Sequence, residues 1–163
     1  MAARTLRIAV GVSLALVVTL SIPFSYQICP SWDVSVVDKS GNPVPGMTVR
    51  LSHQDYSVES ASHEEDRTSD AQGRVSFSER ISRRAYASRA AGAVLSALSQ
   101  GVHASFGRHA YVTAFGHGLQ GSDLSFGVLT DWTGEPNHMS SKITAEPSQL
   151  IEIPSPKKLP LLQ

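Results

Sequence analysis

The chain has 163 residues, 41% of them hydrophobic, and its 14 basic and 14 acidic side chains give a formal net charge of zero. This length is typical of one domain with an additional segment. The balanced charge argues against a nucleic-acid partner, because such proteins concentrate basic residues on one face. A single cysteine, Cys29, excludes an internal disulfide and a multi-cysteine zinc site.

The first segment, residues 1–28, is predicted to be an N-terminal transmembrane helix. No charged residue lies between Arg7 and Asp33, and residues 8–24 contain only three polar side chains. A helix of this length spans the roughly 30 Å hydrocarbon core of a bilayer. Because Arg4 and Arg7 precede it, the positive-inside rule predicts a cytoplasmic N-terminus and an extracytoplasmic domain. We therefore expect the lipid bilayer to be the partner of residues 8–24.

The sequence leaves two fates of this segment open. A cleaved signal peptide has small residues at alternate positions after a short apolar stretch. Here Tyr26, Gln27 and Ile28 occupy the expected place, and the apolar stretch is long. We therefore favour a retained anchor in the cell membrane, with secretion as the alternative if the leader is removed. Cys29 also raises the possibility of lipid attachment or of an intermolecular disulfide. The residues before it do not match a lipoprotein signal.

Two strands joined by a compact corner are predicted next. Trp32–Asp38 and Met47–His53 alternate apolar and polar side chains with period two, which is typical of half-buried strands. The gap between them holds the chain breakers Gly41, Pro43, Pro45 and Gly46. The prolines cannot donate to a β ladder and the glycines accept turn conformations. We expect Val44, between the prolines, to tuck under the sheets.

An acidic cluster, Glu64–Asp66, precedes a turn and a third strand that begins at Arg74. Consecutive carboxylates lack the spaced oxygen ligands of a calcium loop. We therefore expect a solvated loop here in preference to a calcium site. Val75 and Phe77 are expected to share one face of the third strand.

The residues around both turns resemble the carboxypeptidase regulatory-like domain family. The matching residues are Asp38, Ser40, Gly41, Pro43, Val44, Gly46, Val49, Leu51, Thr68, Asp70, Gly73, Val75 and Phe77. The resemblance implies a transthyretin-like (prealbumin-like) Greek-key β-sandwich of about seven strands over residues 30–153. It also implies an accessory, adhesive or structural role in an exported, bacterial-type protein. The family is grouped with carbohydrate-binding-like folds, so sugar binding is the implied alternative.

One inserted helix is predicted over about residues 81–100. Its apolar residues recur at three- and four-residue steps, alanine is frequent, and Gly101 fits the stop position. Its arginines are Arg80, Arg83, Arg84 and Arg89. We expect them to form a solvated basic face over one edge of the sandwich, with contact to anionic lipid headgroups or a partner as the alternative.

Strands are predicted to resume over Arg108–Gly116 and over Leu124–Trp132, the second with a bulge at Gly127. Short closing strands are predicted at residues 141–146 and 149–154. The tail, residues 154–163, contains three prolines and is predicted to be extended or disordered.

No catalytic, cofactor or metal site is predicted. His103, His109 and His117 lie six and eight residues apart, which on one strand separates neighbours by about 20 Å or more. Metal ligands share a centre at roughly 2 Å. Trp132, at a predicted strand end, is the one candidate ligand contact, because sugar sites stack rings on exposed aromatic faces.

The sequence thus predicts a non-enzymatic, membrane-anchored extracytoplasmic module for protein association or structural support in the cell envelope. Its predicted partner is an unidentified envelope protein or a glycan. The alternative is a binding module for a carbohydrate or another ligand.

Overall fold

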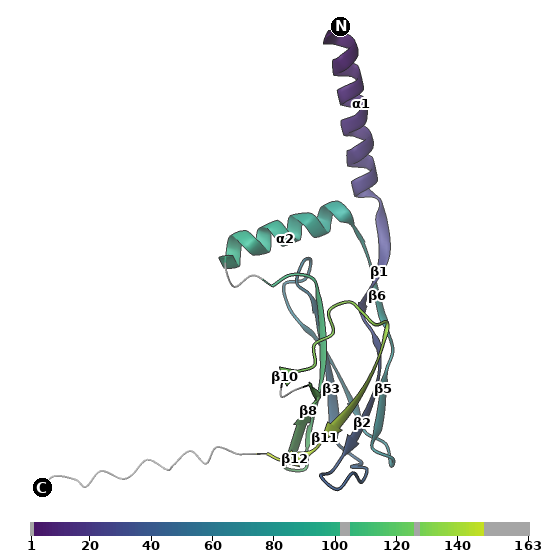
Figure 1. Ribbon diagram of the computed structural model, residues 1–163, viewed down its shortest axis with the longest axis vertical. Coiled ribbons are helices and arrows are strands. Elements are labelled where there is room, and N and C mark those ends of the chain that lie inside the picture. Colours follow the sequence, from purple (N-terminus) through teal and green to yellow (C-terminus); the bar gives the residue numbers. More distant parts are fainter. Residues whose placement is uncertain (1, 102–104, 126–127, 149–163) are drawn as a thin grey trace, which may run out of the picture.

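The computed structural model describes residues 2–101, 105–125 and 128–148 and shows a mainly β protein with a long N-terminal helix (Figure 1). The helices are α1 (Ala2–Ser21) and α2 (Tyr86–Gln100). The strands are β1 (Pro23–Cys29), β2 (Ser31–Val37), β3 (Thr48–Asp55), β4 (His63–Thr68), β5 (Arg74–Phe77), β6 (Arg80–Ala85), β7 (Arg108–Gly116), β8 (Leu119–Ser122), β9 (Leu124–Ser125), β10 (Val128–Leu129), β11 (His138–Thr144) and β12 (Glu146–Pro147).

Two sheets pack against each other around one core. The first has the strand order β11-β2-β5 and the second has the order β12-β8-β7-β3-β4. The core residues include Trp32, Val34, Val36, Val49, Leu51, Phe77, Ala110, Val112 and Ile143, drawn from both sheets. This sandwich-like arrangement confirms the predicted mainly β class. In the first sheet, β11 runs parallel to β2 while β5 runs antiparallel to it.

The period-two patterns place the side chains as predicted. In β2, Trp32, Val34 and Val36 are buried while Asp33 is exposed. The third strand begins at Arg74 as predicted and is β5, and the strand predicted over Arg108–Gly116 is confirmed with those bounds as β7. Full burial of one such apolar side chain contributes roughly 1.5–3 kcal/mol, so the alternation itself selects the faces that meet.

The corner between β2 and β3 is built as expected. Asp38 Oδ1 accepts hydrogen bonds from the backbone N–H groups of Ser40 and Asn42, both at 2.8 Å. Hydrogen bonds from Asn42 hold the pKa of Asp38 below its usual range. The backbone N–H of Val44 donates to Val36 O at 3.0 Å, and the Val44 side chain packs against the core. The prediction for Val44 is confirmed.

The N-terminal apolar segment ends earlier than predicted. α1 stops at Ser21, and residues 23–29 form β1, whose Cys29 belongs to the core. The helix therefore ends before the end of the predicted segment at residue 28, because the chain after Ile22 is hydrogen-bonded into a sheet. α1 itself is long and apolar enough to cross a membrane.

The inserted helix begins later than predicted. Residues 80–85 form β6, which pairs antiparallel with β1 from Pro23↔Ala85 to Cys29↔Arg80. The prediction of helix from residue 81 is wrong over this stretch, because β1 requires a partner for its backbone groups and β6 is that partner. The helical prediction holds from Tyr86.

Two further segments differ from the sequence-based expectation. Leu124–Trp132 is not one strand: β9 and β10 pair with each other antiparallel, and Trp132 forms a separate bridge with Ala110. Glu64–Asp66 is not a loop but part of β4, at the edge of the five-stranded sheet. The Gly127 bulge, the strand at 149–154 and the tail 154–163 lie outside the described residues.

Gly73 provides a test of the corner. Its φ is +70°, and a Cβ added at Gly73 would overlap the carbonyl oxygen of Val36. Gly41 has a similar φ of +85°, but a Cβ added there would meet no other atom. We expect Gly41→Ala to cost about 1–2 kcal/mol for backbone strain alone. Gly73→Ala is expected to cost at least about 2 kcal/mol more, because β2 must move.

The measurement is urea unfolding of the full chain in detergent micelles, followed by the fluorescence of the buried Trp32 and Trp132. Equal losses of unfolding free energy in the two variants would show that the turn has room for a side chain at Gly73.

Candidate functional site

The end of the sandwich next to α1 brings together segments that are distant in sequence. α1 passes into β1 with only Ile22 between them. α2 lies across the same end, at a steep angle to α1 (Figure 1). We call this region the α1 end; its residues come from β1, from the end of β3 with the turn after it, and from α2.

A buried carboxylate lies at the centre of the α1 end. Asp55 is 0% exposed. Its Oδ2 accepts a hydrogen bond from the Tyr26 hydroxyl at 2.9 Å, and its Oδ1 accepts one from the Ser57 backbone N–H at 3.1 Å. Arg89 Nη2 lies 3.6 Å from Oδ2. We call Tyr26, Asp55, Ser57 and Arg89 the Asp55 cluster.

Arg89 makes a second contact within the Asp55 cluster. Its guanidinium carbon lies 4.3 Å from the centroid of the Tyr26 ring, which is a favourable cation–π position. Burial is the main cause that raises the pKa of Tyr26, and the hydrogen bond to Asp55 raises it further. The phenol therefore stays protonated as a donor at neutral pH, and one arginine of α2 contacts both β1 and β3.

Close backbone packing also holds α2 to the turn after β3. A Cβ added at Gly92 would overlap the carbonyl oxygen of Ser57. A glycine in the middle of a helix is costly by roughly 0.5–1 kcal/mol relative to alanine. Its presence here allows the helix backbone to reach the turn, so α2 is seated on the sandwich by Arg89 and Gly92 together.

Next to the Asp55 cluster lies a pair of histidines. The rings of His53 and His63 stack with their centroids 5.4 Å apart. Burial lowers the pKa of His53, so its ring is neutral at pH 7. Glu59 Oε2 accepts the Asp55 backbone N–H at 2.7 Å, while its Oε1 lies 3.5 Å from His63 Nε2. Across residues 2–101, 105–125 and 128–148, no three His, Cys, Asp or Glu side chains converge on a point where a metal ion would bind.

The histidines singled out in the sequence are not brought together. His109 Nδ1 pairs with Asp131 Oδ2 near the start of β7. His117 lies in the turn after β7, where its Nε2 is 3.2 Å from Gly46 O. The length of β7 separates them, and His103 lies outside the described residues.

Trp132 does not offer an exposed ring. It is 1% exposed, and its indole N–H donates to Pro136 O at 2.6 Å. The Arg108 guanidinium lies 5.5 Å from its ring centroid. The ring is part of the core, so the sugar-stacking role considered for Trp132 has no accessible aromatic face at this residue.

The acidic cluster is matched by nearby arginines. Arg50 binds Asp66 through two nitrogens at 2.8 Å and Glu64 through a third at 2.8 Å. Glu65 pairs with Arg67 and Arg80, and the Arg80 hydrogen bond is the main cause that holds the pKa of Glu65 below its usual range. All three carboxylates are therefore engaged in ion pairs, with Arg50 of β3, with Arg67 of β4 itself and with Arg80 of β6.

The four arginines expected on one basic helical face are divided. Arg80, Arg83 and Arg84 lie on β6, while Arg89 lies on α2 and points toward the sandwich. The prediction of one continuous basic face is therefore wrong, because the first part of the predicted helix is a strand.

Cys29 is not a surface thiol next to the apolar helix. It is 0% exposed, and burial raises the pKa of its thiol to about 12. A thiol that is both enclosed and protonated does not react at neutral pH. In the folded chain, Cys29 therefore acts as a small core residue.

The Asp55 cluster was not predicted from the sequence. The one local signal is "HQDYS", in which an aspartate follows a strand and precedes a serine, as in an Asx turn. Nothing in that stretch indicates partners as distant as Tyr26 and Arg89. When the chain is compared with known protein families and with curated proteins, neither comparison finds a match.

The Asp55 cluster predicts a specific cost for losing one hydroxyl. Tyr26→Phe removes the donor to a buried carboxylate and keeps the ring under Arg89, so we expect a loss of about 1.5–3 kcal/mol of unfolding free energy. Tyr86→Phe is the matched control, because the Tyr86 ring stacks on Phe24 with centroids 4.1 Å apart. We expect its effect to be within about 0.5 kcal/mol.

Both variants are measured by urea unfolding of the full chain in micelles. A Tyr26→Phe variant as stable as the control would mean that the Tyr26 hydroxyl does not stabilise Asp55.

Proposed function

We propose that α1 spans a lipid bilayer and that the sandwich is a non-enzymatic, extracytoplasmic module for protein association or structural support. α1 has 20 residues, which at 1.5 Å per residue extend about 30 Å, the thickness of a bilayer core. The large apolar side chains of α1 are exposed along its whole length, among them Leu6, Val10, Leu14 and Val18. In water such a surface is unfavourable, and in lipid it is the expected one.

The observation that carries this proposal is the direct passage of α1 into the sheet. Only Ile22 separates the helix from β1, and β1 supplies Tyr26 to the Asp55 cluster and Cys29 to the core. Removal of residues 1–28 would delete Tyr26, the donor to Asp55, and all of β1 except Cys29. Proteases cut exposed, flexible segments most readily, and the single-residue junction is a poor substrate of that kind. Both points support a retained anchor.

The charges near the N-terminus support the orientation. Arg4 and Arg7 lie in the first two turns of α1, and the next charged residue is Asp33 in β2. By the positive-inside rule, the N-terminus stays in the cytoplasm and the sandwich lies outside.

We also propose that the sandwich is of the transthyretin-like, carboxypeptidase regulatory-like kind. The supporting features are the corner formed by Asp38 and Val44 and the second turn at Asp70. Asp70 Oδ1 accepts the backbone N–H groups of Gln72 and Arg74, both at 2.8 Å. These turns contain most of the residues that carry the resemblance.

Two observations favour association over sugar binding. Trp132 is enclosed in the core. Asp55 at the α1 end and Glu65 on β4 are bound to neighbouring side chains and so hold the fold together. The module therefore works through the shape and charge of its surface.

The proposed topology is tested with single cysteines in the full chain, expressed in bacterial cells. A membrane-impermeant maleimide added to spheroplasts is expected to label Lys39→Cys, in the corner after β2, and to leave Thr5→Cys unlabelled until the membrane is opened. The wild-type chain is the control, because Cys29 is buried. The intact mass is expected to be that of the whole 17.5 kDa chain. Label on Thr5→Cys in sealed spheroplasts, or loss of the leader mass, would contradict the proposal.

The association role is tested by photocrosslinking in cells. A photoreactive amino acid at Ser40, in the exposed corner far from α1, is expected to give a discrete protein adduct (Figure 1). The same amino acid at the buried Val36 is the matched control and is expected to give none. Absence of adducts from Ser40 and from Asn42, also in the corner, would argue against a protein partner at this end.

A further inference from the structure

α2 carries an apolar face that points away from the protein. Val94 and Leu98 are 58% and 78% exposed, and Ala91 and Ala87, one and two turns before Val94, are exposed as well. Leu95, 66% exposed, lies at the edge of this face, where it also lines a pocket with the turn after β3. Residues 87, 91, 94 and 98 follow the three- and four-residue steps of one helical face. The exposed stripe of α2 is therefore continuous and apolar.

The opposite face of α2 is the one that meets the sandwich, and it is small and polar. Arg89 reaches Asp55, Gly92 lies against Ser57, and Ser96 lines a pocket with the turn after β3. A surface helix of a water-soluble domain normally does the reverse, with its apolar stripe on the core and its polar residues in solvent. The amphipathicity of α2 is thus inverted. An apolar face of this kind exposed to water is unfavourable and indicates that an apolar partner or lipid covers it.

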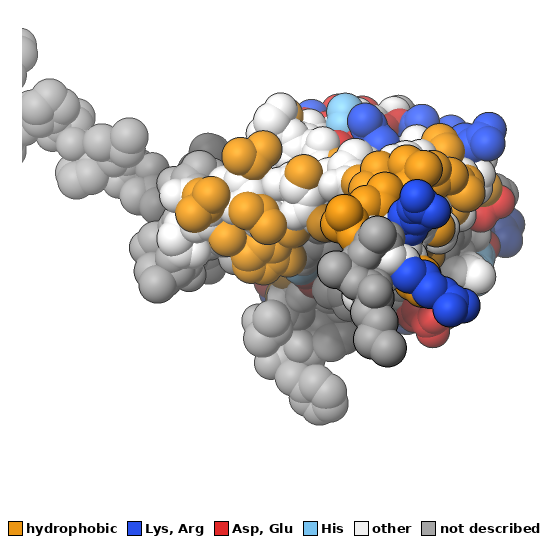
Figure 2. Space-filling view, turned by 90° about the horizontal axis from the view of Figure 1, so that it is seen from above, with side chains coloured by type: hydrophobic (Ala, Val, Ile, Leu, Met, Phe, Trp, Pro, Cys, Tyr) orange, Lys and Arg blue, Asp and Glu red, His pale blue; other side chains and the backbone are white. Residues whose placement is uncertain are grey.

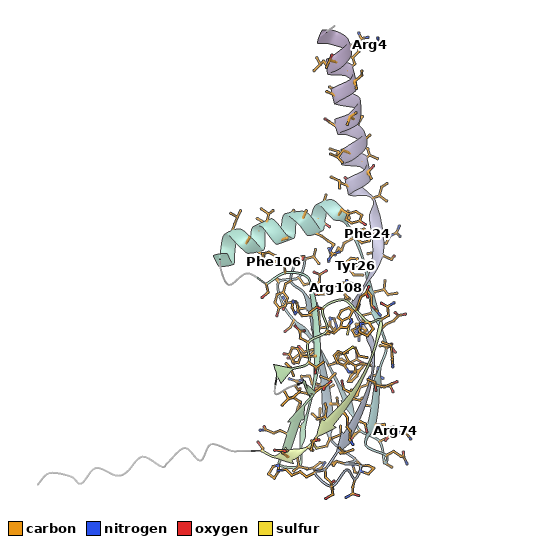
Figure 3. All side chains as sticks on the ribbon, viewed as in Figure 1. Arg4, Phe24, Tyr26, Arg74, Phe106 and Arg108 are labelled. Atoms are coloured by element: carbon orange, nitrogen blue, oxygen red, sulfur yellow. The ribbon has the colours of Figure 1, made fainter. Side chains whose placement is uncertain are left out.

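The position of α2 relative to α1 identifies that covering. Tyr86 is the first residue of α2, and its ring stacks on Phe24, the second residue of β1. α2 therefore begins beside the C-terminal end of α1. Since the inner face of α2 lies on the sandwich, its outer face looks to the side on which α1 extends (Figure 3). Viewed from that side, hydrophobic side chains gather over α1 and α2 (Figure 2).

We propose that α2 lies in the interface of the bilayer that α1 spans, with Val94 and Leu98 among the lipid acyl chains. This inference rests on the proposed function of α1. An in-plane helix with a large apolar face binds the boundary between headgroups and acyl chains. In this placement the Tyr86 ring, stacked on Phe24, lies at the membrane–water interface, where tyrosine is enriched.

The same end carries positive charge that suits anionic headgroups. Arg83 and Arg84 are exposed on β6, opposite Ser25 and Phe24 of β1. They lie just below the end of α1, so in the proposed orientation they reach the headgroup layer. Basic side chains at this level attract anionic lipids. The apolar stripe, the aromatic rings and the arginines therefore form one surface continuous with α1.

The test measures the depth of α2 in a bilayer with the full chain. The fluorophore NBD is attached to Leu98→Cys on the outer face of α2, to Val12→Cys in the middle of α1, or to Lys39→Cys at the other end of the sandwich. Each protein is reconstituted in phosphatidylcholine–phosphatidylglycerol vesicles, with or without lipids that carry a doxyl quencher on the acyl chain. These positions are exposed, so labelling leaves the packing intact.

We expect the quencher lipid to reduce NBD fluorescence at Leu98 and at Val12 and to leave Lys39 unchanged. Quenching at Val12 without quenching at Leu98 would overturn this inference and leave the proposed anchor intact. Blue-shifted but unquenched NBD at Leu98 would also overturn it, because a protein surface, such as a second copy of this chain, would then cover α2. Loss of quenching at both positions would overturn the anchor as well.

Discussion

The architecture depends on one buried charge. A carboxylate removed from water costs several kcal/mol unless partners replace its hydration. Asp55 is fully enclosed, and its oxygens are approached by Tyr26 from β1, by the Ser57 backbone and by Arg89 from α2. β1 and α2 must therefore reach the end of β3 together. Arg89 lies beside Asp55 and compensates its charge, so neither side chain of this pair is an isolated buried charge.

This constraint determines which face of α2 remains outside. Because Arg89 is directed at Asp55 and Gly92 lies against Ser57, the polar and small residues of α2 are used for contact with the sandwich. The apolar stripe that ends at Leu98 is left on the other side, which is the side of α1. An inverted helix is unfavourable for a free domain in water. It is the favourable arrangement for a domain whose top rests on lipid, so the buried cluster and the two helices support the same orientation.

The sequence predicted the parts of the fold that rest on local patterns. Alternation gave the buried faces of β2 and β5, and the placement of Val44 followed from the breakers around it. The errors come from distant contacts. Residues 80–85 have helical neighbours and good helix formers, yet they pair with β1, since tertiary pairing overrides helix propensity. Asp55 lies 29 residues from Tyr26 along the chain, and no short motif records that contact. Trp132 was placed at a strand end, and its bridge to Ala110 buries it.

In the proposed orientation, with α1 and α2 on the bilayer, a partner would meet the end of the sandwich opposite α1 (Figure 1). Addition of a strand at the β4 edge is disfavoured, because β4 carries a row of charged side chains, and charged edges discourage pairing. The turns at Asp38 and Asp70 face away from α1. Each aspartate accepts two backbone N–H groups of its own turn, and Gly73 lies against the backbone of β2. These turns are consequently rigid. A partner that binds there meets a preformed surface, and the ordering entropy that a flexible loop would lose on binding is already lost when the sandwich folds.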